Sequence, residues 1–68
     1  MNGKLKIDII VYNFLKKYPE EEFNLSEIAR GIDKSVPTVT RSIGRLIELD
    51  KVTMTNKRSM KLVRLNLS

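Results

Sequence analysis

Cysteine and histidine are both absent from the 68 residues of this chain. Without cysteine there can be neither a disulfide framework nor a thiolate ligand for a metal ion. Without histidine the chain lacks the commonest metal ligand and the commonest general base. An enzyme would have to work with carboxylates, lysines and hydroxyls alone, and no nucleophile–base pair or metal-binding set is recognisable among them. We therefore expect a protein that is not an enzyme and that carries no cofactor and no metal ion.

Long hydrophobic segments are also absent. The longest aliphatic run, Ile9–Ile10–Val11, is far too short to span a bilayer, and the N-terminus lacks the apolar segment of a signal peptide. A chain of this length predicts one domain over residues 1–68, with a single small core and no room for a deep substrate cleft. These features predict a cytoplasmic protein rather than a membrane protein.

The positive charge of the chain lies in its C-terminal two thirds. The net charge is +5, yet residues 1–23 hold four lysines and four acidic residues and are neutral. Residues 24–68 hold nine Lys and Arg residues against four acidic ones, which accounts for the whole excess. A basic segment favours polyanions, nucleic acid first and an anionic membrane surface second, although many small proteins are basic for solubility alone.

The periodicity of residues 4–18 predicts an amphipathic helix, which Pro19 ends. Its core-facing stripe, with Leu15 at the margin, consists of Ile7, Ile10, Val11, Phe14 and Tyr18. A second apolar group on roughly the opposite side consists of Leu5, Ile9 and Tyr12. One helix cannot easily bury two faces against so small a core. Either this second group contacts another copy of the chain in a homodimer, or the C-terminal strands cover it.

A short second helix is predicted over residues 25–31. Asn24 and Glu27 have the spacing of a capping box at its start, and Gly31 is a natural C′ residue with positive φ at its end. Ser35 then caps a third helix over residues 36–49, and Pro37 is tolerated in the first turn of that helix. Two helices that meet through a turn of about four residues have the sequence form of a helix-turn-helix.

The third helix has two different faces. Its apolar side consists of Val36, Val39, Ile43, Leu46 and Ile47. Its polar, cationic side consists of Pro37, Thr38, Arg41 and Arg45. Thr40 is expected to be half-buried at the core margin. Gly44 costs about 1 kcal/mol relative to alanine inside a helix, so it either packs closely against the first helix or lets a phosphate or a partner approach.

The C-terminal segment predicts a β-hairpin over residues 51–66. Its polar turn, residues 56–59, carries the cations Lys57 and Arg58. Phe23 is expected to anchor a short extended segment between the first two helices. The fold class is therefore mainly α with a small β-hairpin, an α+β arrangement.

Residues 25–30 read LSEIAR, and residues 38–52 read TVTRSIGRLIELDKV. These stretches resemble the "t-x-x-E-[IL]-A" helix and the "tVsrhl…LvelGlV" stretch of bacterial and archaeal winged-helix regulators, as in MarR-like and ArsR-like repressors. The resemblance covers residues 23–55, and Asp50 stands where these regulators usually have glycine. It implies a winged helix-turn-helix of three helices plus a C-terminal wing, which binds double-stranded DNA and regulates transcription.

In such a domain the helix over residues 36–49 enters the major groove, and the hairpin tip touches the minor groove or the flanking backbone. We expect Arg41 to bond a guanine or a phosphate and Arg45 to meet mainly the backbone. Ser35 is expected mainly to cap the helix. The candidate DNA-binding residues are Lys34, Ser35, Pro37, Thr38, Arg41, Arg45, Lys57 and Arg58.

Two interpretations compete with DNA binding. The cationic side of the third helix also fits a solvent-exposed helix that only carries charges, and a charged turn is usually only a solvated turn. A winged helix can also serve as a protein-interaction module in a larger assembly. A salt-dependent affinity for duplex DNA separates both from the DNA-binding hypothesis.

Overall fold

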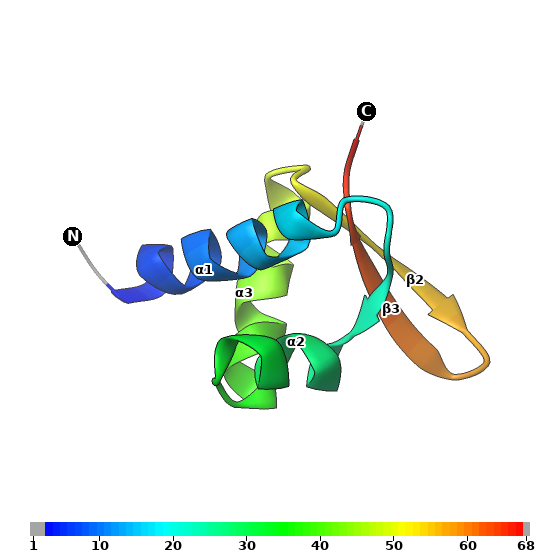
Figure 1. Ribbon diagram of the computed structural model, residues 1–68, viewed down its shortest axis with the longest axis horizontal. Helices are drawn as coiled ribbons and strands as arrows, with labels where there is room; N and C mark the ends of the chain where they lie inside the picture. The colour runs from blue at the N-terminus through cyan, green and yellow to red at the C-terminus, as the bar shows by residue number, and fades with distance from the viewer. Residues whose placement is uncertain (1–2, 68) are drawn as a thin grey trace.

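The computed structural model describes residues 3–67, with side chains from Lys6 onward. The elements in chain order are α1 (Gly3–Lys17), β1 (Phe23–Asn24), α2 (Leu25–Ile32), α3 (Val36–Glu48), β2 (Val52–Lys57) and β3 (Met60–Leu65). The strands form one antiparallel sheet in the order β1-β3-β2, so the protein is of the predicted α+β class. In Figure 1, α1 crosses α3, and the β2–β3 hairpin extends beyond the helices.

The buried stripe of α1 differs from the one that the sequence predicted. Val11 and Leu15 are fully buried, and Asp8, one turn before Val11, is also buried. The prediction that Leu15 lies at the margin is wrong, and Tyr18, assigned to the stripe, is 43% exposed. Positions 8, 11 and 15 are three and four residues apart and share one face of the helix. The stripe that meets the core therefore includes a carboxylate.

An aromatic cluster ties β1 to the end of α1. The ring centroid of Phe14 lies 5.1 Å from that of Phe23 and 5.8 Å from that of Tyr18, and Tyr18 and Phe23 are 5.8 Å apart. Tilted and edge-to-face pairs at these separations are favourable arrangements of aromatic rings. Phe23 thus anchors the short extended segment as predicted, and β1 can pair with β3.

α2 begins with the predicted capping box and ends differently from the prediction. Asn24 Oδ1 accepts a hydrogen bond from the Glu27 backbone N–H at 2.8 Å, and Glu27 Oε1 accepts one from the Asn24 N–H at 2.9 Å. At the other end, Asp33 takes the left-handed conformation with φ 59°. The predicted C′ role of Gly31 is wrong, because Gly31 lies inside α2 and no described glycine has a positive φ.

Gly31 is required instead by its contact with α1. A Cβ added at this position would lie 2.5 Å from the Phe14 ring, which is held by Tyr18 and Phe23. We expect Gly31→Ala to lower the free energy of unfolding by about 1–2 kcal/mol, since the ring must shift within a packed cluster. Thermal unfolding followed by circular dichroism checks this. An unchanged or raised midpoint would show that the ring moves without cost.

α3 begins at an N-cap serine and is followed by a turn at an aspartate with positive φ. Ser35 is its N-cap, as predicted, and its Oγ accepts a hydrogen bond from the Thr38 backbone N–H at 3.4 Å. After Leu49, Asp50 adopts φ 60°, which aspartate tolerates better than most residues. The Lys51 N–H then donates to the Leu46 carbonyl at 2.9 Å, which closes the helix end and sends the chain into β2.

β2 extends two residues further toward the tip than predicted, and the turn is correspondingly tighter. Asn56 and Lys57, predicted in the turn, are the last residues of β2 and pair with Lys61 and Met60 of β3. Only Arg58 and Ser59 form the turn, both with positive φ, as type I′ hairpin turns require. The inner ends of the strands enter the core, which is built from Val11, Leu15, Ile28, Ala29, Val39, Ile43, Leu46, Val52, Val63 and Leu65.

Candidate nucleic-acid interface

The outer face of α3 carries one cation, Arg41, without an ion-pair partner among the described residues. Pro37, Thr40, Arg41 and Gly44 are exposed, whereas the opposite side of the helix is buried through Val39, Ser42, Ile43 and Leu46. Within residues 3–67, Arg41 forms no ion pair and no hydrogen bond through its side chain. The expectation that Thr40 is half-buried is wrong; its hydroxyl donates to the Val36 carbonyl at 2.9 Å and its side chain stays at the surface. The guanidinium of Arg41 is therefore available to an outside acceptor.

The N-terminal end of α3 presents two hydroxyls. Ser35 Oγ and Thr38 Oγ1 lie 2.8 Å apart and share a hydrogen bond in which either can be the donor. One of the two hydroxyl hydrogens is not used in this bond, so the pair can still donate to a phosphate oxygen or a base edge. Beside them, Pro37 is exposed and Val36 is 40% exposed, although the sequence placed Val36 on the apolar side. This end of the helix thus combines hydroxyl and apolar groups.

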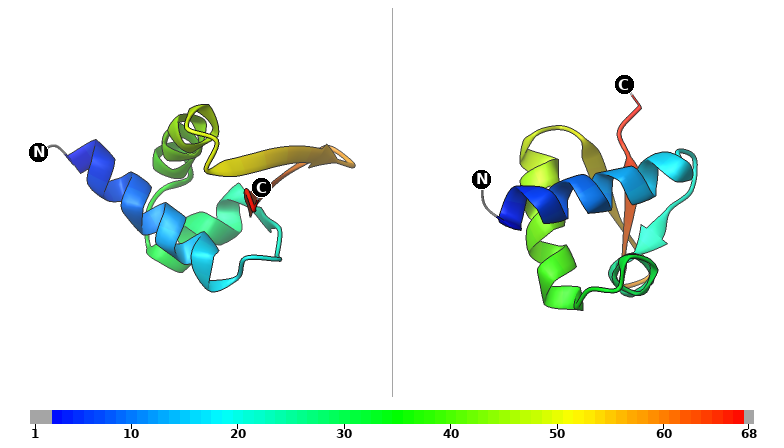
Figure 2. Two further views of the ribbon diagram at one scale, coloured as in Figure 1. Left: turned by 90° about the horizontal axis from the view of Figure 1, so that it is seen from above. Right: turned by 60° about the vertical axis from the view of Figure 1, so that its left-hand side comes forward.

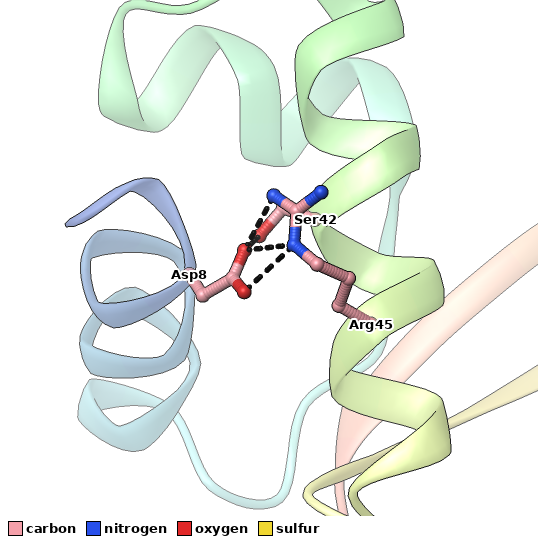
Figure 3. Close-up of polar contacts among 3 residues, drawn as sticks. All are labelled: Asp8, Ser42 and Arg45. Carbon is pink, nitrogen blue, oxygen red and sulfur yellow. Dashed lines mark hydrogen bonds and ion pairs between the residues drawn. The ribbon is translucent and has the colours of Figure 1, made fainter. Parts of the chain in front are cut away.

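Arg45 occupies a different environment from Arg41. Its Nε lies 2.8 Å from Asp8 Oδ2 and 3.1 Å from Oδ1, and its Nη2 lies 2.8 Å from Oδ1 (Figure 3). The buried Ser42 hydroxyl donates to the same Oδ1 at 2.6 Å. Both partners of Asp8 come from α3, so this cluster fixes α1 against α3. Arg45 was predicted to meet mainly the DNA backbone, and its pairing with Asp8 was not predicted. The Asp8 charge offsets the positive charge that Arg45 would bring to such a contact.

The Asp8 carboxylate has a lowered pKa. Hydrogen bonds from the Arg45 guanidinium are the main cause, with a smaller contribution from Ser42, and burial opposes them. Because the folded-state pKa lies below the unfolded-state value, ionised Asp8 stabilises the fold above that unfolded pKa. This contribution is lost as the pH falls through the folded pKa.

This shift predicts how acid changes the difference in stability between the wild type and Asp8→Asn. At neutral pH we expect Asp8→Asn to unfold at a lower temperature than the wild type, because the charge-assisted bonds are lost. Below about pH 4 the difference should narrow, since the wild type then loses the same contribution. Unfolding midpoints at pH 7, 4 and 3 check this. If the difference between the two unfolding midpoints stayed constant down to pH 3, the lowered pKa of Asp8 would be contradicted.

The hairpin tip and the turn between α2 and α3 hold the other predicted cations. Lys57 Nζ lies 3.2 Å from Glu22 Oε1, at the surface, where an ion pair contributes little and exchanges readily. Arg58 and Lys34 are exposed and form no ion pair within the described residues. Arg58 lies in the turn between β2 and β3, and the left view of Figure 2 shows this hairpin extending away from the helices. Arg58 and Lys34 are therefore accessible from solvent, whereas Lys57 is held by Glu22.

The predicted dimer residues lie beside an apolar groove. Ile9 is 58% exposed and Tyr12 is half-buried, while the Leu5 side chain lies outside the described residues. The alternative that the strands cover this side is wrong for Ile9. The groove holds about 270 Å³ and is lined by Asp8, Ile9, Tyr12, Leu46, Leu49 and Lys51. Leu49, 62% exposed at the end of α3, was not predicted to belong to this surface.

The described residues form neither a metal-binding cluster nor a membrane-spanning helix. Among residues 3–67, no group of three acidic side chains lies close enough to hold a metal ion. No helix in this part of the chain is long and apolar enough to cross a membrane. Gly44 is exposed, and a Cβ there would meet nothing within 4 Å, which rules out the first of its two alternatives, close packing against α1. Comparison with protein-family models, curated proteins and solved structures found no match.

Proposed function

We propose that this protein is a winged helix-turn-helix domain that binds double-stranded DNA and regulates transcription by occupying a promoter. α3 is the recognition helix in the major groove, and the β2–β3 hairpin is the wing on the minor groove or adjacent backbone. The observation that carries the proposal is Arg41, an exposed guanidinium without an ion-pair partner on the outer face of α3. Arg58 at the hairpin tip and Lys34 before α3 supply further positive charge.

Each candidate side chain is assigned to base edges, to phosphates or to a structural role according to its chemistry. Pro37 and Thr38, near the N-terminal end of α3, meet base edges, where the end of a recognition helix usually enters the groove. Arg41 bonds a guanine or a phosphate. Lys34, Lys57 and Arg58 bond phosphates and so position the protein without reading sequence. Ser35 mainly caps the helix, and Arg45 mainly holds Asp8.

Binding to a mixed-sequence duplex of about 30 base pairs tests this proposal. At about 50 mM salt we expect a dissociation constant in the micromolar range or tighter, since non-specific DNA binding is stronger at low salt. Fluorescence anisotropy of a labelled duplex measures it. No binding at about 50 μM protein would contradict the proposal and favour the alternative of a protein-interaction module.

We further propose that the protein is a homodimer through the apolar groove between α1 and the end of α3. The surface carries both the groove and the protruding side chains of Ile9 and Leu49, so a two-fold axis lets each copy fill the groove of the other. Leu49 and Ser35 are at opposite ends of α3, roughly 20 Å apart at 1.5 Å per residue. The dimer therefore leaves the N-terminal end of α3 uncovered, and it predicts a palindromic site with half-sites about 34 Å apart.

The dimer predicts a change in sedimentation. The double variant Ile9→Ser/Leu49→Ser should sediment as a monomer at concentrations where the wild type is a dimer, because two exposed apolar side chains of the interface become polar. Ile47→Ser is the matched control, since Ile47 is 38% exposed on α3 and does not line the groove. A wild type that is monomeric at about 100 μM, or a control that dissociates as fully as the double variant, would contradict the dimer.

A further inference from the structure

Gly44 is a costly residue for which the fold itself gives no reason. It lies inside α3, where glycine destabilises a helix relative to alanine. Its φ is not positive, and a Cβ built on it would meet nothing within 4 Å. Gly31 is the opposite case, since a Cβ there would lie 2.5 Å from the Phe14 ring. Packing therefore explains why residue 31 is glycine, but it does not explain why residue 44 is.

The position of Gly44 connects it to the proposed DNA-binding face. Thr40 and Arg41 are four and three residues before it, and Pro37 is seven residues before it, so all lie on one side of α3. All four are exposed. The missing side chain makes a notch in this face, where the helix backbone itself is accessible. The notch is bordered by Arg41 on one side and by Glu48, one turn later, on the other.

We infer that Gly44 is the position at which one sugar–phosphate strand of the duplex passes against the backbone of α3, an inference that rests on the proposed DNA-binding function. Gly44 lies about 10 Å along the helix axis from Pro37. The major groove is about 8.5 Å deep. If α3 enters the groove with its N-terminal end foremost and its axis along the groove depth, Gly44 is at the height of the groove wall, which is the sugar–phosphate backbone.

The flanking charges agree with a phosphate strand at this level. Arg41 attracts a phosphate toward the notch, and Glu48 repels one that passes further along the helix. A strand between these two side chains lies over residue 44. Any side chain there would hold the strand away from α3 and lengthen the bonds that Arg41 and Thr38 make.

Gly44→Ala and Gly44→Leu test this inference. In the free protein we expect both to unfold several degrees higher than the wild type, because they improve helix propensity at an open position. Folding failure therefore cannot mimic the effect. Affinity for the mixed-sequence duplex should fall about five- to tenfold for Gly44→Ala and further for Gly44→Leu, as expected when a packed contact is overfilled. Neither change should alter the salt dependence by a full unit, since no charge is removed.

Asn13→Ala is the matched control. Asn13 is exposed in α1, so alanine there also improves helix propensity while leaving the face of α3 intact. It should bind the duplex as the wild type does. If the wild type binds and Gly44→Leu binds equally well, this inference is overturned while the proposed function stands. If the wild type itself binds no duplex, both are overturned.

Discussion

Arg41→Ala is expected to weaken binding of the mixed-sequence duplex by about tenfold. A bidentate arginine contact contributes about 1–3 kcal/mol, and the Arg41 guanidinium has no ion-pair partner among the described residues to restrain it. If Arg41 meets a phosphate, the slope of log K against log salt should also decrease by about one. The unfolding midpoint should hardly change, because exposed side chains contribute little to stability.

Two further variants separate a specific contact from a loss of charge. Lys17→Ala removes the same charge from the last turn of α1, next to the acidic loop of residues 20–22, and should bind the duplex nearly as the wild type does. Arg41→Lys keeps the charge but cannot make a bidentate contact, so it should recover only part of the affinity. Equal losses for Lys17→Ala and Arg41→Ala would contradict the assignment of α3 as the recognition helix.

Asp8→Ala is expected to lower the free energy of unfolding by about 2–3 kcal/mol. The substitution removes the carboxylate that accepts from both Ser42 and Arg45, and it leaves the fully buried Ser42 hydroxyl without that acceptor. The hydrogen bonds and the ion pair by which Asp8 joins α1 to α3 are lost at the same time (Figure 3). For a domain of this size the midpoint should fall by roughly 10–20 °C.

The exposed ion pair between Lys57 and Glu22 provides the control. Glu22→Ala breaks the exposed pair with Lys57 and should change stability by less than about 0.5 kcal/mol. Denaturant unfolding of both variants compares the two pairs directly. Similar small losses for Asp8→Ala and Glu22→Ala would show that the Asp8 cluster does not hold α1 against α3.

Most of the helical framework was predictable because its signals are local. The capping box of Asn24 and Glu27 and the N-cap at Ser35 depend on residues three apart in the chain, and each helix begins and ends within one residue of its predicted position. At Gly31 the prediction failed because of a contact distant in sequence. Gly31 has the sequence context of a helix end, but its contact with Phe14 decides its role, and Asp33 takes the left-handed turn instead.

The candidate site was predictable in its exposed part and not in its buried part. Periodicity alone places Arg41 on the outer face of α3. Arg45 has the same charge and lies four residues after Arg41, on the same predicted side of the helix. It pairs with Asp8 only because α1 packs against this part of α3. A signal existed, since Asp8 lies three and seven residues before Val11 and Leu15 and thus on the stripe that the core buries. A carboxylate on such a stripe requires a partner, but the sequence does not show which cation reaches it.

The salt dependence of duplex binding tests the central proposal most directly. Four cations contribute to this dependence. Lys34, Lys57 and Arg58 are assigned to phosphates, and Arg41 is assigned to a guanine or a phosphate. Each phosphate contact contributes about 0.9 to the slope, so the plot of log K against log salt should have a slope of about −3 to −4 per bound protomer. A measurable affinity with this slope, reduced by about one in Arg41→Ala, is the predicted result. A slope near zero, or no binding at low salt, would contradict a DNA-binding function.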